Sequence, residues 1–145
     1  MADSPPQGET LQQLRDRIDR IDEQMIELLN RRADVVVQIG RFKQGSGTAV
    51  YAPDREHEVL ERIRRLNGGP LPDRTVSAIW REMMSGSFAL EKPLRVAYLG
   101  PEGSFSHLAA MRKFGASVDY MPTTDIRTVF TEVRRGHVDL GIVPI

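Results

Sequence analysis

Apolar residues recur every three or four positions through the first third of the chain. They are Leu11, Leu14, Ile18, Ile21, Met25, Leu28, Val35, Ile39 and Phe42. Thr10 and Gln13 form a capping box at the start of this run, which contains no proline and one glycine, Gly40, before Gly45. The pattern predicts a single helix of about 50 Å, at about 1.5 Å per residue, which is too long for a small monomer to cover.

Two shorter helices are expected to follow. The stretch QGSGTAVYAPDRE ends the heptad pattern, and Pro53 suits the first turn of a second helix. NGGPLPD ends this helix, and a third is expected from about Pro72 or Asp73 to residue 91. The expected apolar faces are Val59, Leu60, Ile63 and Leu66 in the second helix, and Val76, Ile79, Trp80, Met83, Met84 and Phe88 in the third. Residues 10–91 are therefore predicted to be an all-α domain.

From residue 94 the pattern changes to buried strands that alternate with helices. LRVAYLG, SVDYM and VDLGIVPI are the expected strands, and PEGSFSHLAAMRKFG and TTDIRTVFTEVRRG the expected helices. This order predicts a βαβαβ unit with a parallel sheet, an incomplete α/β segment that leaves a sheet edge and much apolar surface uncovered. The predicted organisation is a disordered tail (1–9), the helical domain (10–91), a linker (92–93) and the partial α/β domain (94–145).

Composition excludes several kinds of chemistry. The chain has 145 residues and a formal net charge of zero, so it lacks the basic excess that favours nucleic acid or anionic membranes. It has no cysteine, and His57, His107 and His137 lack ligand spacing, so we expect no metal site. With no secretory signal and no apolar run of membrane-span length, a cytoplasmic location is expected.

The apolar residues follow a seven-residue repeat with positions a to g, in which Leu11 is an a position. One a position of this heptad pattern, residue 32, holds a cation. Arg32 either fixes helix register by pairing with a carboxylate across an interface or receives an anionic ligand, because a guanidinium can bind a carboxylate through two hydrogen bonds. Arg15 and Lys43 flank the same stripe about 42 Å apart, whereas Arg32 and Lys43 are about 16 Å apart and could lean together around a ligand. An antiparallel helix pair with its two-fold near Met25 and Ile26 would create two equal pockets. Each would take Arg15 from the partner chain.

Four further polar residues bear on this site. Ser87 and Glu91 follow the apolar stripe of the third helix at positions expected to be buried, although either could be a solvated helix end. Arg55 and Glu56 open the second helix, where a surface pair at a helix N-terminus is the simpler interpretation. The pattern alone leaves these alternatives open.

Taken together, these residues resemble the all-helical chorismate mutase family. The similarity runs through LRDRIDRIDEQMIELLNRRADVVVQIGRFK, YAPDRE and MMSGSFALE. It implies three helices that intertwine in an antiparallel homodimer with shared active sites. It also implies the cofactor-free rearrangement of chorismate to prephenate, a step of phenylalanine biosynthesis. In this family Arg15 from the partner and Arg32 would hold the two carboxylates of chorismate, and Lys43 would donate to the ether oxygen and one carboxylate.

The resemblance assigns the other polar residues as well. Glu56 would contact the ring hydroxyl, Ser87 a carboxylate, and Arg55 would support the substrate from the pocket rim. Glu91 would face the ether oxygen, where only its protonated form can help, so activity is expected to rise toward mildly acidic pH. Ala52 stands where the family often has aspartate, so one contact to a hydroxyl is expected to be absent.

The second half carries another resemblance. VAYLGPEGSFSHLAA and GIVPI are similar to the start of prephenate dehydratase, whose two-lobed fold is like that of periplasmic binding proteins. GPEGSFS could hold a carboxylate with backbone amides and Ser104 or Ser106, or it could be an ordinary capped βα turn. The similarity ends before that family's catalytic motif, so we expect a bifunctional parent protein but no dehydratase activity from this chain.

Two other functions compete with the mutase. A non-catalytic helical dimerisation module would explain the heptads but not the combination of Arg15, Arg32, Lys43 and Ser87. An isochorismate pyruvate lyase of the same fold would need a similar clamp for a dicarboxylate. The dehydratase-like segment favours the mutase, because a dehydratase consumes the mutase's product.

Overall fold

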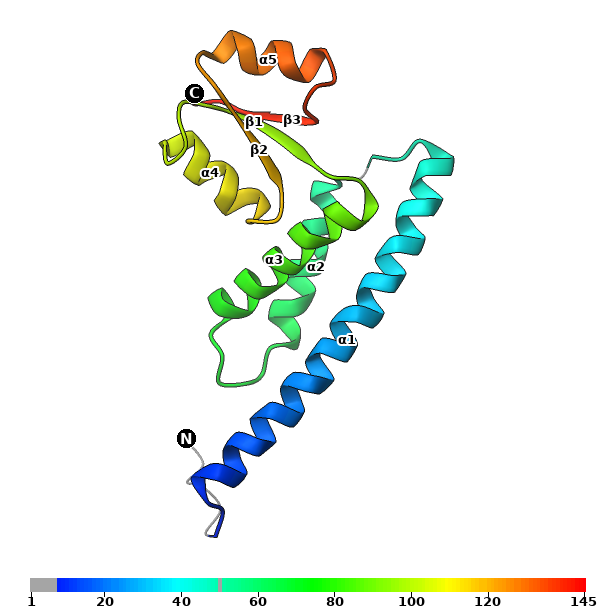
Figure 1. The fold of residues 1–145 in the computed structure, drawn as a ribbon, viewed down its shortest axis with the longest axis vertical. Helices are drawn as coiled ribbons and strands as arrows, with labels where there is room; N and C mark the ends of the chain where they lie inside the picture. Colours follow the sequence, from blue (N-terminus) through cyan, green and yellow to red (C-terminus); the bar gives the residue numbers. More distant parts are fainter. Residues whose placement is uncertain (1–7, 50) are drawn as a thin grey trace. The chain divides into compact units, whose positions relative to one another are not determined.

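The computed structural model describes residues 8–49 and 51–145. The chain divides into two compact units, one extending to Val35 and the other from Val36 to Ile145. The elements in chain order are α1 (Leu11–Ser46), α2 (Pro53–Leu66), α3 (Asp73–Glu91), β1 (Arg95–Leu99), α4 (Phe105–Phe114), β2 (Asp119–Thr123), α5 (Ile126–Arg134) and β3 (Leu140–Ile142) (Figure 1). These are the helices and strands that the hydrophobic pattern predicts, in the predicted order. Most of the predicted tail, residues 1–7, lies outside the described residues.

The three strands form a parallel sheet in the order β2-β1-β3, which confirms the predicted βαβαβ unit. Helices α4 and α5 cover opposite faces of this sheet (Figure 1). Val96 of β1 packs with Phe114 on the α4 side, while the next residue, Ala97, packs with Val129 on the α5 side. Alternate residues of the central strand therefore supply two separate small cores.

Side-chain caps begin both helices of this sheet segment. The Oγ of Ser104 accepts the backbone N–H of His107 at 3.3 Å, and Oδ1 of Asp125 accepts that of Thr128 at 2.8 Å. The side-chain and then the backbone hydrogen bond from Thr128 lower the pKa of Asp125 below its ordinary value. The helix after each βα turn thus begins at an N-cap residue whose side chain accepts a hydrogen bond from the first turn of that helix.

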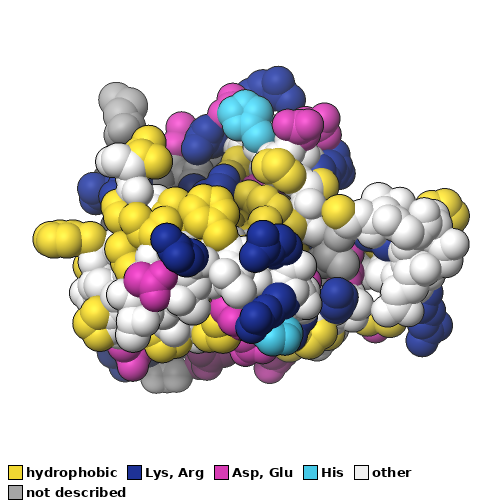
Figure 2. Space-filling view, turned by 90° about the horizontal axis from the view of Figure 1, so that it is seen from above, with side chains coloured by type: hydrophobic (Ala, Val, Ile, Leu, Met, Phe, Trp, Pro, Cys, Tyr) yellow, Lys and Arg dark blue, Asp and Glu magenta, His cyan; other side chains and the backbone are white. Residues whose placement is uncertain are grey.

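Apolar surface is exposed around α5 and β3, as the incomplete sheet predicts. Phe130 is 64% exposed, and Ile126 and Val133 on the same helix are exposed as well. A recess of about 570 Å³ beside them is lined in part by Gly141 and Val143. Figure 2 shows hydrophobic side chains at the surface among lysines and arginines on the face that it views.

Helices α2 and α3 pack against each other within the second unit. They begin at Pro53 and Asp73, as predicted, and Nε of Arg64 donates to Oγ of Ser77 across the pair at 3.3 Å. Leu66 and Ile79, which were expected on the apolar faces, are exposed instead. For Ile79 the reason is that α3 faces α2 and also contacts α4, and its buried positions are Val76, Ser77 and Ser85.

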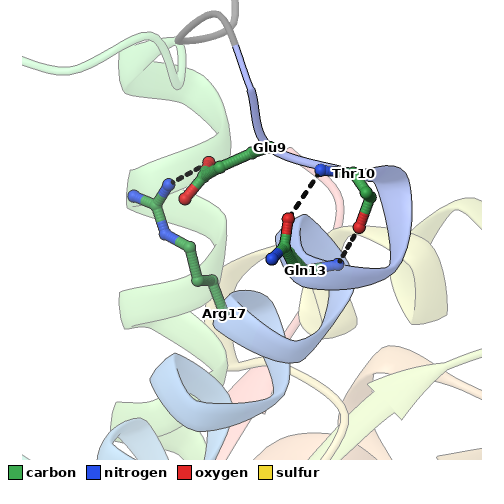
Figure 3. A network of polar contacts seen from close by, with 4 residues as sticks. All are labelled: Glu9, Thr10, Gln13 and Arg17. Atoms are coloured by element: carbon green, nitrogen blue, oxygen red, sulfur yellow. Dashed lines mark hydrogen bonds and ion pairs between the residues drawn. The ribbon is translucent and has the colours of Figure 1, made fainter.

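Helix α1 begins at the predicted capping box. The backbone N–H of Gln13 donates to Oγ1 of Thr10 at 3.2 Å, and the backbone N–H of Thr10 donates to Oε1 of Gln13 at 2.8 Å (Figure 3). Arg17 and Glu9 form an ion pair beside it at 2.8 Å. Glu9, which was predicted to belong to the disordered tail, is therefore paired with the helix.

The apolar stripe of α1 is exposed in the single chain. Phe42 is 77% exposed, and Leu11, Ile21 and Leu28 are also exposed. Of the described residues of this helix, Val36 and Gly40 are the two that are buried. An apolar stripe of this length is typical of a helix that another helix covers.

Within residues 8–49 and 51–145, no helix is both long enough and apolar enough to cross a bilayer. The same residues contain no group of three or more histidine, aspartate or glutamate side chains placed to hold a metal ion.

Candidate functional site

Lys43 and Glu91 meet where α1 and α3 end. The Nζ of Lys43 lies 2.9 Å from Oε2 of Glu91, and only 10% of the Glu91 side chain is exposed. Glu91 is therefore not a solvated helix end, which was one of its two interpretations. The ammonium group stabilises the negative charge of a largely buried carboxylate.

A glycine allows these two helices to approach each other. A Cβ placed on Gly40 would lie 3.0 Å from the Cα of Glu91, closer than side chains normally pack. Lys43 follows Gly40 by almost one turn, so the close approach brings its amine within reach of the Glu91 carboxylate. No role for Gly40 is predicted from the sequence. The available signal was an isolated glycine in a long helix, where glycine costs about 1 kcal/mol relative to alanine and usually has a packing reason.

A recess of about 430 Å³ lies at this ion pair. Its wall includes the end of α1 with the following loop and the segment from Glu91 to Leu94. It also includes Asp139 and Leu140 next to β3. The volume suits a small-molecule ligand. Both the helical and the sheet segments of the second unit therefore line the place where Lys43 and Glu91 meet.

Arg55 and Glu56 contact other residues. Arg55 is exposed and forms an ion pair with Glu58 at 3.0 Å, which agrees with the simpler interpretation of a surface pair. Glu56 is mostly buried and faces α4, where Nζ of Lys113 lies 3.7 Å from its Oε1. Ala52 occupies the N-cap position of α2 and supplies no capping side chain.

The remaining predicted site residues lie on α1 and α3. Ser87 is half-buried, and its hydroxyl donates to the carbonyl oxygen of Met83 at 2.8 Å. Arg15 and Arg32 belong to the first unit, in which Arg15 is exposed and Arg32 is half-buried. Of the seven predicted residues, the structure thus brings Lys43 and Glu91 into direct contact.

The GPEGSFS stretch forms a capped βα turn. In addition to capping α4, Oγ of Ser104 donates to the carbonyl oxygen of Leu99 at 3.1 Å. The backbone N–H of Gly103 donates to Nδ1 of His107 at 2.9 Å. The hydrogen-bonding groups of Ser104 and Gly103 are therefore engaged within the chain, as in the simpler of the two interpretations.

Family models assign both parts of the chain. The model for chorismate mutase type II matches residues 14–92, more than half of the chain, and the model for prephenate dehydratase matches residues 96–145. The chain therefore belongs to the chorismate mutase type II family, and residues 96–145 of its second part are similar to prephenate dehydratase.

Individual relatives combine both names. The bifunctional chorismate mutase/prephenate dehydratase of Aquifex aeolicus (strain VF5) is 44% identical over 141 residues, which cover 94% of this chain and 39% of that protein. The protein of the same name from Pseudomonas aeruginosa is 44% identical over 140 residues, 93% of this chain and 38% of that protein. The chain thus spans about two fifths of the length of these curated relatives.

A solved structure extends the likeness to the fold. Chorismate mutase (form II) from Thermus thermophilus superposes with a TM-score of 0.57 at 36% identity. The match covers 58% of this chain and 96% of that chain. Nearly the whole of that protein thus corresponds to little more than half of this one.

Proposed function

We propose that this chain rearranges chorismate to prephenate, and that Lys43 and Glu91 act on the ether oxygen of the substrate. The observation that supports this most directly is their contact beside a recess of suitable size, in a chain of the chorismate mutase type II family. The rearrangement breaks a carbon–oxygen bond and forms a carbon–carbon bond within one molecule, so no group is gained or lost. Lys43 stabilises the charge that grows on the ether oxygen as its bond breaks.

Arginines supply the clamp for the substrate's two carboxylates. Arg32 would hold one carboxylate and the partner's Arg15 the other, while Ser87 adds a hydroxyl donor. Such a clamp keeps the extended substrate in the folded conformation from which it reacts, so part of the ordering entropy is lost on binding rather than in the chemical step. Glu56 and Arg55 are proposed to contact the ring hydroxyl and the rim. These contacts require side-chain positions other than their pairs with Lys113 and Glu58 in the single chain.

The shared pocket requires a second copy of the chain. Arg15 and Lys43 stand about 42 Å apart on an ideal helix, so one α1 cannot present both to one small molecule. An antiparallel homodimer would bring Arg15 of the partner to the pocket and would cover the exposed apolar stripe of α1.

A cytoplasmic location stays a prediction.

A second activity is proposed for proteins of the relatives' full length. Residues 96–145 match prephenate dehydratase, and the relatives named for both activities are much longer than this chain. We expect such a protein to convert the prephenate formed by its mutase, and we expect this chain alone to leave prephenate unchanged.

Product analysis tests the proposed function against its rivals. The pure chain is incubated separately with chorismate and with isochorismate, and the products are identified by chromatography. Prephenate from chorismate is expected. Release of pyruvate from isochorismate, without prephenate formation, would establish the lyase, and no reaction with either compound would favour a dimerisation module.

Glu91→Gln is expected to flatten the pH dependence of the mutase. Ionised Glu91 repels the charge that develops on the ether oxygen, so wild-type activity should rise toward mildly acidic pH. A glutamine amide can donate at every pH. The measurement is kcat/KM for chorismate between about pH 5 and about pH 9 for both proteins. A wild-type rate that stays flat or climbs toward alkaline pH would rule out this role for Glu91.

Gly40→Val is expected to lower kcat by at least about tenfold, because the new side chain pushes α3 away and separates Lys43 from Glu91. Gly45→Val is the matched control. It makes the same change on the same helix, but a Cβ there would meet nothing within 4 Å. Steady-state kinetics of both variants decide the matter, and equal losses would show that the contact with Glu91 is irrelevant to the rate.

A further inference from the structure

The turn between α4 and β2 is bound to α3 by a carboxylate. Glu82 of α3 accepts the backbone N–H of Ala116 at 2.9 Å and the hydroxyl of Ser117 at 2.8 Å. One turn further along α3, Oγ of Ser85 accepts the backbone N–H of Ser117 at 3.2 Å. The Glu82 contacts are exposed and that of Ser85 is partly buried, and hydrogen bonds to a charged acceptor are stronger than those between neutral groups.

Gly115 allows the backbone of the same turn to approach α3 closely. Its φ is +82°, and a Cβ at this position would lie 2.5 Å from Cβ of Ser85 and 2.7 Å from its Oγ. Its carbonyl oxygen also accepts the hydroxyl of Tyr120 at 2.5 Å. Burial, followed by the negative charge of Glu82, raises the pKa of Tyr120 to about 12, so this hydroxyl remains a donor at neutral pH.

Aromatic packing continues the contact toward the proposed mutase site. The ring of Phe114, the last residue of α4, lies 5.3 Å from that of Tyr51, which in turn lies 5.9 Å from that of Phe88 on α3. Both pairs are edge-to-face, a favoured geometry for aromatic rings. Phe88 precedes Glu91 by almost one helical turn. A continuous row of packed groups thus connects α4 to the residue that Lys43 contacts.

Two further contacts connect the dehydratase-like segment to the proposed mutase site. Lys113 of α4 faces Glu56, the residue proposed to contact the ring hydroxyl. Asp139 and Leu140, which belong to the sheet segment, form part of the wall of the recess at Lys43 and Glu91. The dehydratase-like segment therefore reaches the proposed mutase site along two helices and at the recess itself.

From these contacts we infer that residues 113–117, the end of α4 and the turn after it, are a positioning element for the mutase. Through Glu82, Ser85 and Phe88 they fix α3, and with it the place of the Glu91 carboxylate opposite Lys43. This inference rests on the proposed mutase function. It adds that the dehydratase-like segment contributes to mutase catalysis without touching the substrate.

Two pairs of matched variants test the inference in the full chain. Gly115→Ala is compared with Gly136→Ala, a second glycine at positive φ whose added Cβ would meet nothing within 4 Å. Both glycines have a positive φ, and only the Cβ added at Gly115 would collide with α3. Glu82→Ala is compared with Glu61→Ala, the same change at a partly exposed position of α2, where the carboxylate pairs with Arg64 of its own helix and not with the turn.

The readouts are kcat and KM for chorismate, with the melting temperature measured in parallel. Assays are run well below the lowest melting temperature, so that loss of folded protein does not enter the rate. Gly115→Ala is expected to lower kcat by about tenfold relative to Gly136→Ala while KM changes by less than about twofold, because a misplaced Glu91 acts on the transition state. Glu82→Ala should lower kcat several-fold relative to Glu61→Ala.

The outcomes separate this inference from the proposed function. An active wild-type chain whose Gly115→Ala and Glu82→Ala variants match their controls in kcat would overturn the positioning role and leave the mutase standing. A rise in KM at unchanged kcat would also overturn it. If Gly115→Ala does not fold, the Glu82→Ala comparison decides. A wild-type chain that forms no prephenate would remove the proposed function and this inference together.

Discussion

Arg32→Ala is expected to lower kcat/KM for chorismate by about a thousandfold, which corresponds to ~4 kcal/mol of transition-state stabilisation. The reason is that the guanidinium of Arg32 replaces an apolar side chain in the stripe of α1 and is proposed to bind a substrate carboxylate through two hydrogen bonds. Removing it would leave that carboxylate desolvated without its partner. Steady-state kinetics with chorismate measure the loss.

Arg31 provides the matched control for this prediction. It is the adjacent arginine on the same helix, but it occupies a flanking g position and is exposed. Arg31→Ala removes the same charge and the same side chain, and its kcat/KM should stay within about threefold of wild type. If both variants lost activity equally, general electrostatics of α1 rather than a specific clamp would account for the effect.

Mixing two inactive variants is expected to restore activity. Arg15→Ala and Arg32→Ala each damage every pocket of their own homodimer, but a mixed dimer contains one pocket with both arginines. Random exchange of chains should therefore recover about a quarter of the wild-type activity, because half of the dimers are mixed and each has one intact pocket of two. The experiment mixes the purified variants, allows subunit exchange and measures the rate.

Each variant treated alone by the same exchange procedure is the control for the mixing experiment. Activity should appear only in the mixture and should grow with the exchange time. A mixture that remains inactive, although mass spectrometry detects mixed dimers, would exclude pockets shared between two chains.

Local sequence signals were sufficient for the elements of the fold. The capping box of Thr10 and Gln13 and the proline at position 53 act within a few residues, so the helix starts can be inferred without knowing the rest of the chain. The strands follow from short apolar runs bounded by turn residues. The parallel sheet then follows from the alternation of strands and helices.

Contacts between distant segments could not be inferred in this way. Lys43 and Glu91 are 48 residues apart, and Glu82 and Ala116 are 34 apart. Periodicity gives the face on which such a residue lies, but the partner depends on how whole helices pack. For this reason the pattern marked Glu91 as a polar residue at a buried position but gave it no partner, while Glu82 was not singled out at all.

The exposed positions on α2 and α3 illustrate the same limit. Ile79 falls in the apolar phase of α3, yet the buried side of this helix contains Ser77 and Ser85. Serine is small enough to sit beneath another helix or a glycine turn, and its hydroxyl can satisfy a donor there. Hydrophobicity alone therefore misses buried serines where close backbone approach, rather than apolar bulk, determines the packing.

Glycines on two neighbouring segments hold α3 at two levels, Gly115 at Ser85 and Gly40 at Glu91. Ser85 and Glu91 are separated by about one and two-thirds turns and point about 120° apart around the helix axis. A helix held at two levels and from two directions can neither rotate nor slide without losing one contact. The place of the Glu91 backbone is consequently fixed when the chain folds, so the entropy of positioning it is not lost again when a substrate binds.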